Sequence, residues 1–173
     1  MNTKEPTFEQ AINATILWCK AWETGELSDE VLADRVSELL ASRNGTRGFF
    51  VISLSSDCPL MDRLPESLIL RLRAAGDIVV DLCVRNLAMS TAMAIHHERI
   101  GDITHQTGSE RIIDRCLELL RLLEPNAVKK RLETLLQATL EGKGNDISFL
   151  NRWNYDNEQK LAIASNIYAV AEQ

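Results

Sequence analysis

The chain has 173 residues, of which 45% are hydrophobic and 25% are charged. This length is enough for a single domain over residues 1–173 that buries its own core without disulfides or a structural metal. The net charge of −6 argues against a nucleic-acid binder, because the neutralisation of phosphates needs a cationic surface.

The four cysteines are widely separated, and none of them belongs to a C-x-x-C pair. The first ten residues, MNTKEPTFEQ, contain no apolar signal region, and no apolar run approaches the length that spans a membrane. We therefore expect a soluble, cytoplasmic protein. Its thiols should be free and buried, at Cys19, Cys58, Cys83 and Cys116.

The N-terminal part is expected to form a hairpin of two helices. Residues 7–10, Thr-Phe-Glu-Gln, have the form of a capping box, and apolar residues follow at helical spacing as far as Gly25. Ser28 is followed by two acidic residues and opens a second helix, which Asn44-Gly45 should end.

Residues 48–54, Gly-Phe-Phe-Val-Ile-Ser-Leu, are the one segment where a strand competes with a helix. The segment is short, apolar and partly β-branched, which is typical of a buried strand. A lone strand would have no partner in this chain. A short buried helix is therefore favoured.

The central stretch, residues 65–98, contains the least polar part of the chain. Charged residues recur every four positions in its first half and mark a solvated stripe, at Arg73, Asp77, Asp81 and Arg85. From residue 86 to residue 95 there is no charge, and many of the residues are small. A helix that is apolar or small on every side is a buried one.

An unbroken helix over residues 65–98 would be about 50 Å long at 1.5 Å per residue. A compact chain of this size is only about 40 Å across. Ala75-Gly76-Asp77 offers a C-terminal glycine followed by a capping aspartate, so we expect a break or kink at Gly76. A long central apolar helix should then occupy the chain near residues 77–97.

Residues 101–108 are rich in glycine and threonine and are expected to form a flexible loop. Two helices should come next, over residues 109–123 and 126–141, with Pro125 closing the turn between them. The second helix is expected to turn its apolar residues inward, namely Val128, Leu132, Leu135, Leu136 and Leu140.

Residues 147–155 form an irregular aromatic stretch, and residues 156–159 resemble another capping box. The last helix is expected to face the core with Leu161, Ala164, Ile167, Tyr168 and Ala171. Together these segments predict an all-α fold, a compact bundle of about six or seven helices or a globin-like packing.

The three histidines, His96, His97 and His105, define a histidine cluster near two carboxylates. Imidazole and carboxylate together can hold a transition metal, which makes His97, Asp102 and His105 the candidate metal ligands. Adjacent helical positions point about 100° apart, so His96 and His97 would seldom share an ion. The favoured interpretation is that the histidines end a helix, where its dipole favours positive charge.

Known catalytic patterns are not matched. The chain has no His-Glu-x-x-His zinc motif and no Glu-x-x-His pair of a di-iron bundle. Glu23 and Glu26 imitate half of a helical pyrophosphohydrolase motif, and the other half is missing. Cys58 lies beside Asp57, which would raise rather than lower a thiol pKa. No catalytic residue is therefore assigned.

A cavity for a flat apolar ligand is a second possibility. Several aromatic residues could line it, and Arg85 with Asn86 could meet a polar group at its edge. The candidate ligand-binding residues are Cys83, Arg85, Asn86 and Trp153.

The order of three short segments is similar to that of motifs in the phycobiliproteins, helical globin-like antenna proteins that attach linear tetrapyrroles to cysteine. The segments are Cys83-Val84-Arg85-Asn86, Gly101-Asp102 and Asp114-Arg115-Cys116-Leu117. The resemblance implies an oligomerising helical fold with Cys83 and Arg85 near a pigment. The chain departs from the family at Asn86, where aspartate is expected, and in a longer distance from Gly101-Asp102 to Asp114.

Taken together, these features predict a cytoplasmic helical protein that works through protein–protein contacts, as a scaffold or regulator without catalytic activity, and as a homodimer. The small residues should lie in the core or at a dimer interface, at Ala88, Thr91, Ala92 and Ile95, and the core is favoured. A small-molecule-binding protein and a metal-assisted enzyme using the histidine cluster stay open as alternatives. No motif specifies a cofactor or a protein partner, and neither nucleic acid nor a membrane is expected as a partner.

Overall fold

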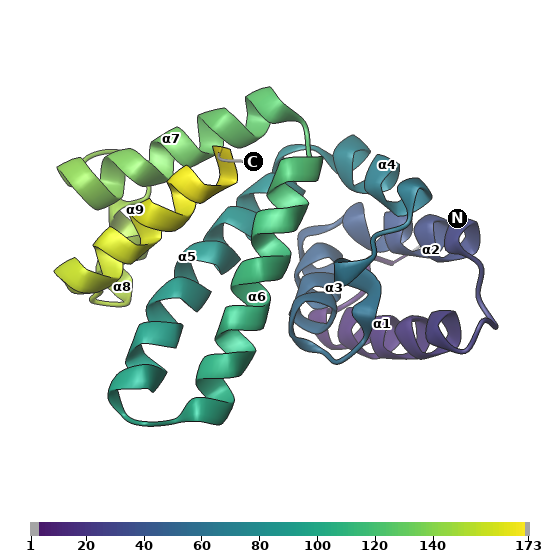
Figure 1. Cartoon of the computed structure of the whole chain (residues 1–173). Helices are drawn as coiled ribbons and strands as arrows, with labels where there is room; N and C mark the ends of the chain where they lie inside the picture. The colour runs from purple at the N-terminus through teal and green to yellow at the C-terminus, as the bar shows by residue number, and fades with distance from the viewer. Residues whose placement is uncertain (1–3, 172–173) are drawn as a thin grey trace. The chain divides into compact units, whose positions relative to one another are not determined.

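The computed structural model describes residues 4–171, and within that range it contains nine α-helices, one 3₁₀ turn and no strand (Figure 1). The all-α prediction is confirmed. The number of helices exceeds the six or seven expected, and a globin-like packing is not confirmed. One helix that was not expected is the short one that forms within the aromatic stretch at 147–155.

The chain divides into two compact units, Met1–Leu82 and Cys83–Gln173, and each is described by itself. Their boundary falls within the helix α5 (Asp77–Arg99). The single domain expected over residues 1–173 stays a prediction.

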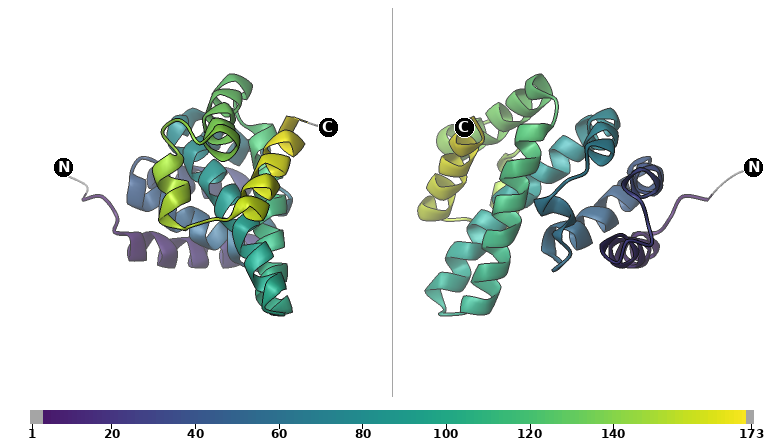
Figure 2. Two further views of the ribbon diagram at one scale, coloured as in Figure 1. Left: turned by 90° about the vertical axis from the view of Figure 1, so that its left-hand side faces the viewer. Right: turned by 45° about the vertical axis from the view of Figure 1, so that its right-hand side comes forward.

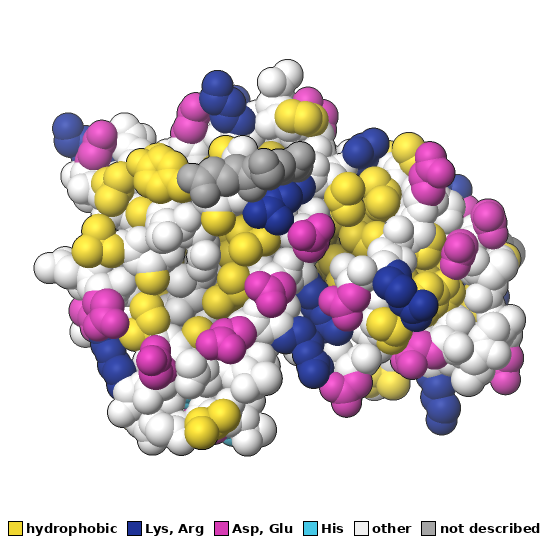
Figure 3. Space-filling view, viewed as in Figure 1, with side chains coloured by type: hydrophobic (Ala, Val, Ile, Leu, Met, Phe, Trp, Pro, Cys, Tyr) yellow, Lys and Arg dark blue, Asp and Glu magenta, His cyan; other side chains and the backbone are white. Residues whose placement is uncertain are grey.

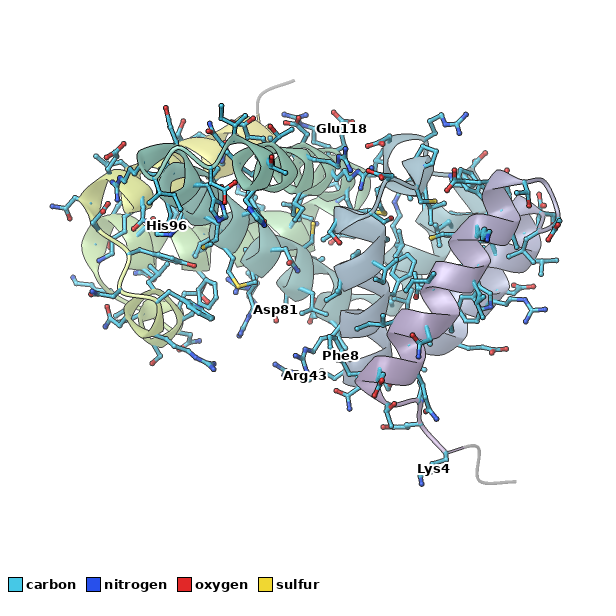
Figure 4. All side chains as sticks on the ribbon, turned by 90° about the horizontal axis from the view of Figure 1, so that it is seen from below. Lys4, Phe8, Arg43, Asp81, His96 and Glu118 are labelled. Carbon is cyan, nitrogen blue, oxygen red and sulfur yellow. The ribbon has the colours of Figure 1, made fainter. Side chains whose placement is uncertain are left out.

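Unit 1 is built from four helices and a 3₁₀ turn: α1 (Phe8–Glu23), α2 (Asp29–Leu40), α3 (Arg43–Ser55), η1 (Pro59–Asp62) and α4 (Glu66–Ala75). α3 packs against both α1 and α2, and α2 also packs against α4. The capping box at the start of α1 is confirmed, since Thr7 and Gln10 exchange hydrogen bonds between side chain and backbone. Figure 4 marks Phe8 at this end of α1, where the Arg47 guanidinium lies 4.8 Å from the centre of its ring.

The helix α3 confirms the helical prediction for residues 48–54 and corrects the one for Asn44-Gly45. Gly45 does not end α2; it lies in the first turn of α3, where its N–H donates to the Ser42 hydroxyl that caps this helix. At Gly48 a Cβ would come within 2.5 Å of the Ala11 Cβ, so only glycine permits this approach of α1 and α3. Phe49 and Phe50 then fill the core edge to face, with ring centres 5.1 Å apart.

The expected break at Gly76 is confirmed. Gly76 ends α4 with φ of +73°, a conformation that residues with a Cβ rarely adopt, and α5 begins at the next residue. The Gly76 carbonyl accepts from the N–H of Val79. The long central helix is therefore real, with residues 77–99 in place of the 77–97 expected.

Unit 2 contains the rest of α5, then α6 (Ile103–Leu122), α7 (Pro125–Glu141), α8 (Ile147–Arg152) and α9 (Asn157–Ala171). The loop expected over 101–108 is wrong: only a tight turn separates α5 from α6, which run side by side in the right-hand view of Figure 2. The reason is local. Gly101 reverses the chain with φ of +72°, and the Asp102 carboxylate then caps α6 by accepting from the His105 N–H.

The small residues of α5 lie in the core of unit 2, where α9 covers them. Ala88 and Ala92 are fully buried, and Thr91 is nearly so. The Asn166 side chain donates to the Thr91 hydroxyl at 2.7 Å, and the Gln159 amide donates to the Ala92 carbonyl at 3.1 Å.

In the described part of the chain, α5 is the one helix whose length and composition would allow it to cross a membrane. This differs from the expectation that no apolar run reaches that length. Half of its most apolar window is buried inside the protein, and the core helix of a soluble protein passes the same test.

Candidate functional site

Two hollows, both bordered by Tyr168, lie along the surface that α7 and α9 share in unit 2. The apolar groove has a volume of about 530 Å³ and is floored mainly by Leu120, Leu123, Val128, Leu132, Ile167 and Val170. The outer hollow, about 540 Å³, is lined by Lys130, Glu133, Thr134, Leu136, Gln137, Leu140, Glu141 and Tyr168. Both are open to solvent, and Glu133, Leu136 and Tyr168 border both. We call the two hollows and the ridge between them the α7–α9 face.

Apolar side chains are exposed on this face. The side chains of Leu140 and Tyr168 are each about half exposed, at 50% and 52%. Figure 3 shows hydrophobic side chains gathered over α7 and α9, with charged side chains beside them. The helix α9 carries apolar residues on opposite sides, and a helix of this kind cannot bury all of them within its own unit.

Capping and ion pairs hold the two helices in place. Glu124 caps α7 by accepting from the N–H groups of Asn126 and Ala127. Arg131 of α7 makes a two-pronged ion pair with Asp146 before α8, at 2.5 and 2.9 Å, and both side chains are largely buried.

Both ends of α9 are tied down as well. Arg121 of α6 donates to the Ala169 carbonyl at 2.7 Å. At the other end, Arg99 pairs with Asp156 at 2.7 Å and with Glu158 at 2.6 Å. The Arg99 guanidinium lowers the pKa of Asp156, and the Gln159 N–H contributes in the same direction.

The structure brings the predicted metal ligands together at the α5–α6 turn. His105 Nδ1 lies 2.6 Å from Asp102 Oδ2, and the His97 and His105 rings are 5.3 Å apart. Figure 4 marks His96, whose ring lies 5.5 Å from that of His97. The His105 N–H, and then its ring, lowers the pKa of Asp102. Among residues 4–171 no group of three or more potential ligands is arranged to hold a metal ion. Asp102 is the N-cap of α6, because its carboxylate accepts from the His105 N–H.

The predicted ligand-binding residues do not line the α7–α9 face. Cys83 is fully buried beside the Cys116 carbonyl, and this burial raises the pKa of its thiol well above the ordinary value. Arg85 lies over the Phe149 ring at 5.6 Å, while Trp153 is half exposed on the turn after α8. Neither hollow of the α7–α9 face is lined by Cys83, Arg85, Asn86 or Trp153. The pigment site that the phycobiliprotein resemblance implied therefore has no accessible thiol at Cys83.

Three of the four predicted interface residues are also inside. Ala88, Thr91 and Ala92 are buried, α9 donates hydrogen bonds to the Thr91 hydroxyl and the Ala92 carbonyl, and Ile95 is partly exposed. They form a core surface, the alternative that the sequence favoured, because α9 supplies the helix that packs on them.

A family model described as Uncharacterised conserved protein UCP020893 matches residues 7–170. The chain belongs to this family. No curated protein and no solved structure is significantly similar to it. The match runs from the N-cap of α1 to the last turn of α9, so both units of this UCP020893 protein belong to the sequence that the family shares.

Four residues of the UCP020893 protein that were expected to face inward are exposed: Leu140, Leu161, Tyr168 and Ala171. A signal existed in the last helix, where apolar residues occur on more sides than one core can cover.

Proposed function

We propose that this protein is a cytoplasmic, non-catalytic interaction protein, a scaffold or regulator that works as a homodimer and makes its contacts through the α7–α9 face. The observation that carries the proposal is the open apolar groove bordered by half-exposed Tyr168, with half-exposed Leu140 in the neighbouring hollow. Single exposed apolar side chains are ordinary, but a contiguous apolar surface is typical of an interaction site.

The energetics favour covering this face. Full burial of a leucine side chain contributes about 1.5–3 kcal/mol, so covering the exposed half of Leu140 would contribute on the order of 1 kcal/mol. Tyrosine is enriched among the residues that dominate binding, because it is large, rigid and carries a polar end.

The shape of the groove separates this proposal from a small-molecule site. Its volume of about 530 Å³ lies within the range of ligand pockets, which keeps that alternative in second place. Such pockets enclose most of their ligand, however, whereas this groove stays open to solvent. An open groove fits a helix that buries one face and leaves the other in water.

Site-specific photo-cross-linking tests the proposal in the protein's own cells. A photoreactive benzoylphenylalanine replaces Tyr168 or, as a control, Leu70, which is 56% exposed on α4 of unit 1. We expect a discrete adduct from position 168 that mass spectrometry identifies as polypeptide, and none from position 70. No polypeptide adduct from position 168 would overturn the proposal, and a small-molecule adduct would favour the second candidate.

A further inference from the structure

We propose that Cys19 and Cys58 of unit 1 are a site of reversible oxidation, at which hydrogen peroxide joins the two thiols in a disulfide. The bond would tie α1 covalently to the start of η1. The site lies outside the α7–α9 face and does not depend on the proposed function, which uses neither cysteine.

The four cysteines lie in two contacting pairs, one in each unit. The Cys58 thiol donates to the Cys19 carbonyl at 3.9 Å, and the Cys19 thiol donates to the Cys58 sulfur. In unit 2 the Cys83 thiol donates to the Cys116 carbonyl at 3.6 Å, and its sulfur also contacts the Cys116 thiol. Each cysteine therefore has a second thiol beside it, as a disulfide requires.

Access from solvent separates the two pairs. Cys19 and Cys58 are 4% and 5% exposed, whereas Cys83 and Cys116 are at 0%. Cys58 also stands outside any helix, between α3 and η1, where the backbone can adjust as the two sulfurs approach. Both cysteines of unit 2 are held within long helices. Hydrogen peroxide is nearly as small as water, so it reaches the sulfurs of the first pair far more readily than those of the second.

The surroundings of Cys58 give the order of the reaction. Burial raises the pKa of the Cys58 thiol, while the Leu60 N–H and the Cys19 thiol act in the opposite direction. Burial raises the pKa of Cys19 to about 12, and its contact with Cys58 adds to the rise. Because the thiolate is the nucleophile, Cys58 reacts with the peroxide and Cys19 then closes the disulfide.

The reaction balances with hydrogen peroxide as the oxidant. The Cys58 thiolate attacks one peroxide oxygen, the O–O bond breaks, and the released hydroxide takes up a proton to become water. The Cys19 sulfur then attacks the sulfur of the Cys58 sulfenic acid, the S–O bond breaks, and a second water leaves with the Cys19 proton. Two thiols have lost two electrons, and one peroxide has become two waters. A low-molecular-weight dithiol reverses the change by thiol–disulfide exchange.

Glu23 sets how readily the site reacts. It lies one helical turn after Cys19 on α1, and its carboxylate accepts from the Cys58 thiol. A carboxylate in this position favours the neutral thiol over the thiolate. Glu23 therefore slows the oxidation of Cys58, so that the site responds only to a raised concentration of peroxide.

Disulfide mapping of the full, reduced chain after peroxide treatment tests the proposal. We expect a bond between Cys19 and Cys58, and recovery of both thiols with dithiothreitol. Cys83 and Cys116 are the internal control and should stay free. In the Cys19→Ala variant, dimedone should label Cys58 as a sulfenic acid, and in Cys58→Ala it should not label Cys19. Circular dichroism checks that both variants fold.

A charge-neutral variant tests the surroundings of the site. Glu23→Gln should speed disulfide formation several-fold, because the Cys58 thiolate is then populated more often. The control Glu26→Gln removes the same charge from an exposed position beyond the end of α1, and it should leave the rate unchanged. An unchanged or slower rate for Glu23→Gln would overturn the part assigned to this carboxylate.

Met93 supplies a scale for the dose of peroxide, because its thioether is 40% exposed and forms a sulfoxide without a thiolate. If Met93 is oxidised while Cys19 and Cys58 remain free thiols, the proposal is overturned. Equal rates of oxidation for the two cysteine pairs would overturn it as well, because the contacts and exposure of the first pair would then not select the site.

Discussion

Ala92 is a small core residue of unit 2 at a contact between α5 and α9. Its side chain is fully buried, and its carbonyl accepts from Gln159 of α9, so two helices meet at this point. Glycine plays the same part in unit 1, where Gly48 lets α3 approach α1 at Ala11. In both units a small side chain sets the distance between two helices.

A larger residue at position 92 should therefore push α9 away from α5. We expect Ala92→Trp to lower the free energy of unfolding by about 3 kcal/mol through overpacking. The control is Met93→Trp at the neighbouring position, where the side chain is 40% exposed and the change should stay within about 0.5 kcal/mol. Urea denaturation measures both, and equal effects at the two positions would contradict the packing described.

Some helix boundaries could be predicted from the sequence and others could not. The capping box at Thr7 and the break at Gly76 involve only neighbouring residues, and both were predicted correctly. Asn44-Gly45 and residues 101–108 were misread, because Gly45 lies in the first turn of α3, Gly101 forms a single tight turn and Gly108 lies within α6. A glycine in a sequence indicates a backbone conformation or a close approach that other residues do not allow. Whether a loop or a new helix comes after it depends on whether an N-capping residue lies nearby.

The start of α9 should be sensitive to acid. Arg99 lowers the pKa of Asp156, so the ionised carboxylate favours the folded state. By linkage, this stabilisation is complete above the ordinary value near 3.8 and is lost as the pH falls through the lowered pKa.

We therefore expect Asp156→Asn to reduce the melting temperature at pH 6 and to have little effect at pH 2. Glu38→Gln, on the exposed surface of α2, controls for the loss of one negative charge. Calorimetry across this pH range measures the difference. An equal loss for Asp156→Asn at both pH values would show that the ion pair with Arg99 does not stabilise the protein.

At the scale of the whole molecule, the question is whether α5 is a core helix of a soluble protein or a membrane-spanning helix. Its length and composition would permit a membrane span. Two of its central residues nevertheless meet polar side chains of α9, at Thr91 with Asn166 and at Ala92 with Gln159. Lipid could not supply these hydrogen bonds.

We therefore expect the full chain in the soluble fraction after high-speed centrifugation of a cell lysate. Alkaline carbonate washing distinguishes the alternatives, because it releases proteins held at a membrane surface and leaves spanning proteins behind. Retention of the chain in the carbonate-resistant pellet would contradict the core role of α5.

The site was less predictable than the fold. Asp102 and His105 were expected together and do meet, because they lie three residues apart in one helical turn. The exposed positions of Leu140 and Tyr168 were not expected, since their spacing equally suits an inward face. Spacing shows that a helix has an apolar side but does not show whether another element covers it.

The sequence by itself determined that this protein is all-helical, that its central helix breaks at Gly76, and that the small residues after Arg85 are buried. These features depend on backbone hydrogen bonds, capping and the periodicity of apolar residues, all of which act within a few positions. The tertiary structure alone decided that α9 covers the small residues of α5 and that Tyr168 faces solvent. The physical reason is that burial depends on which distant helix packs on a given surface, and no local pattern carries that information.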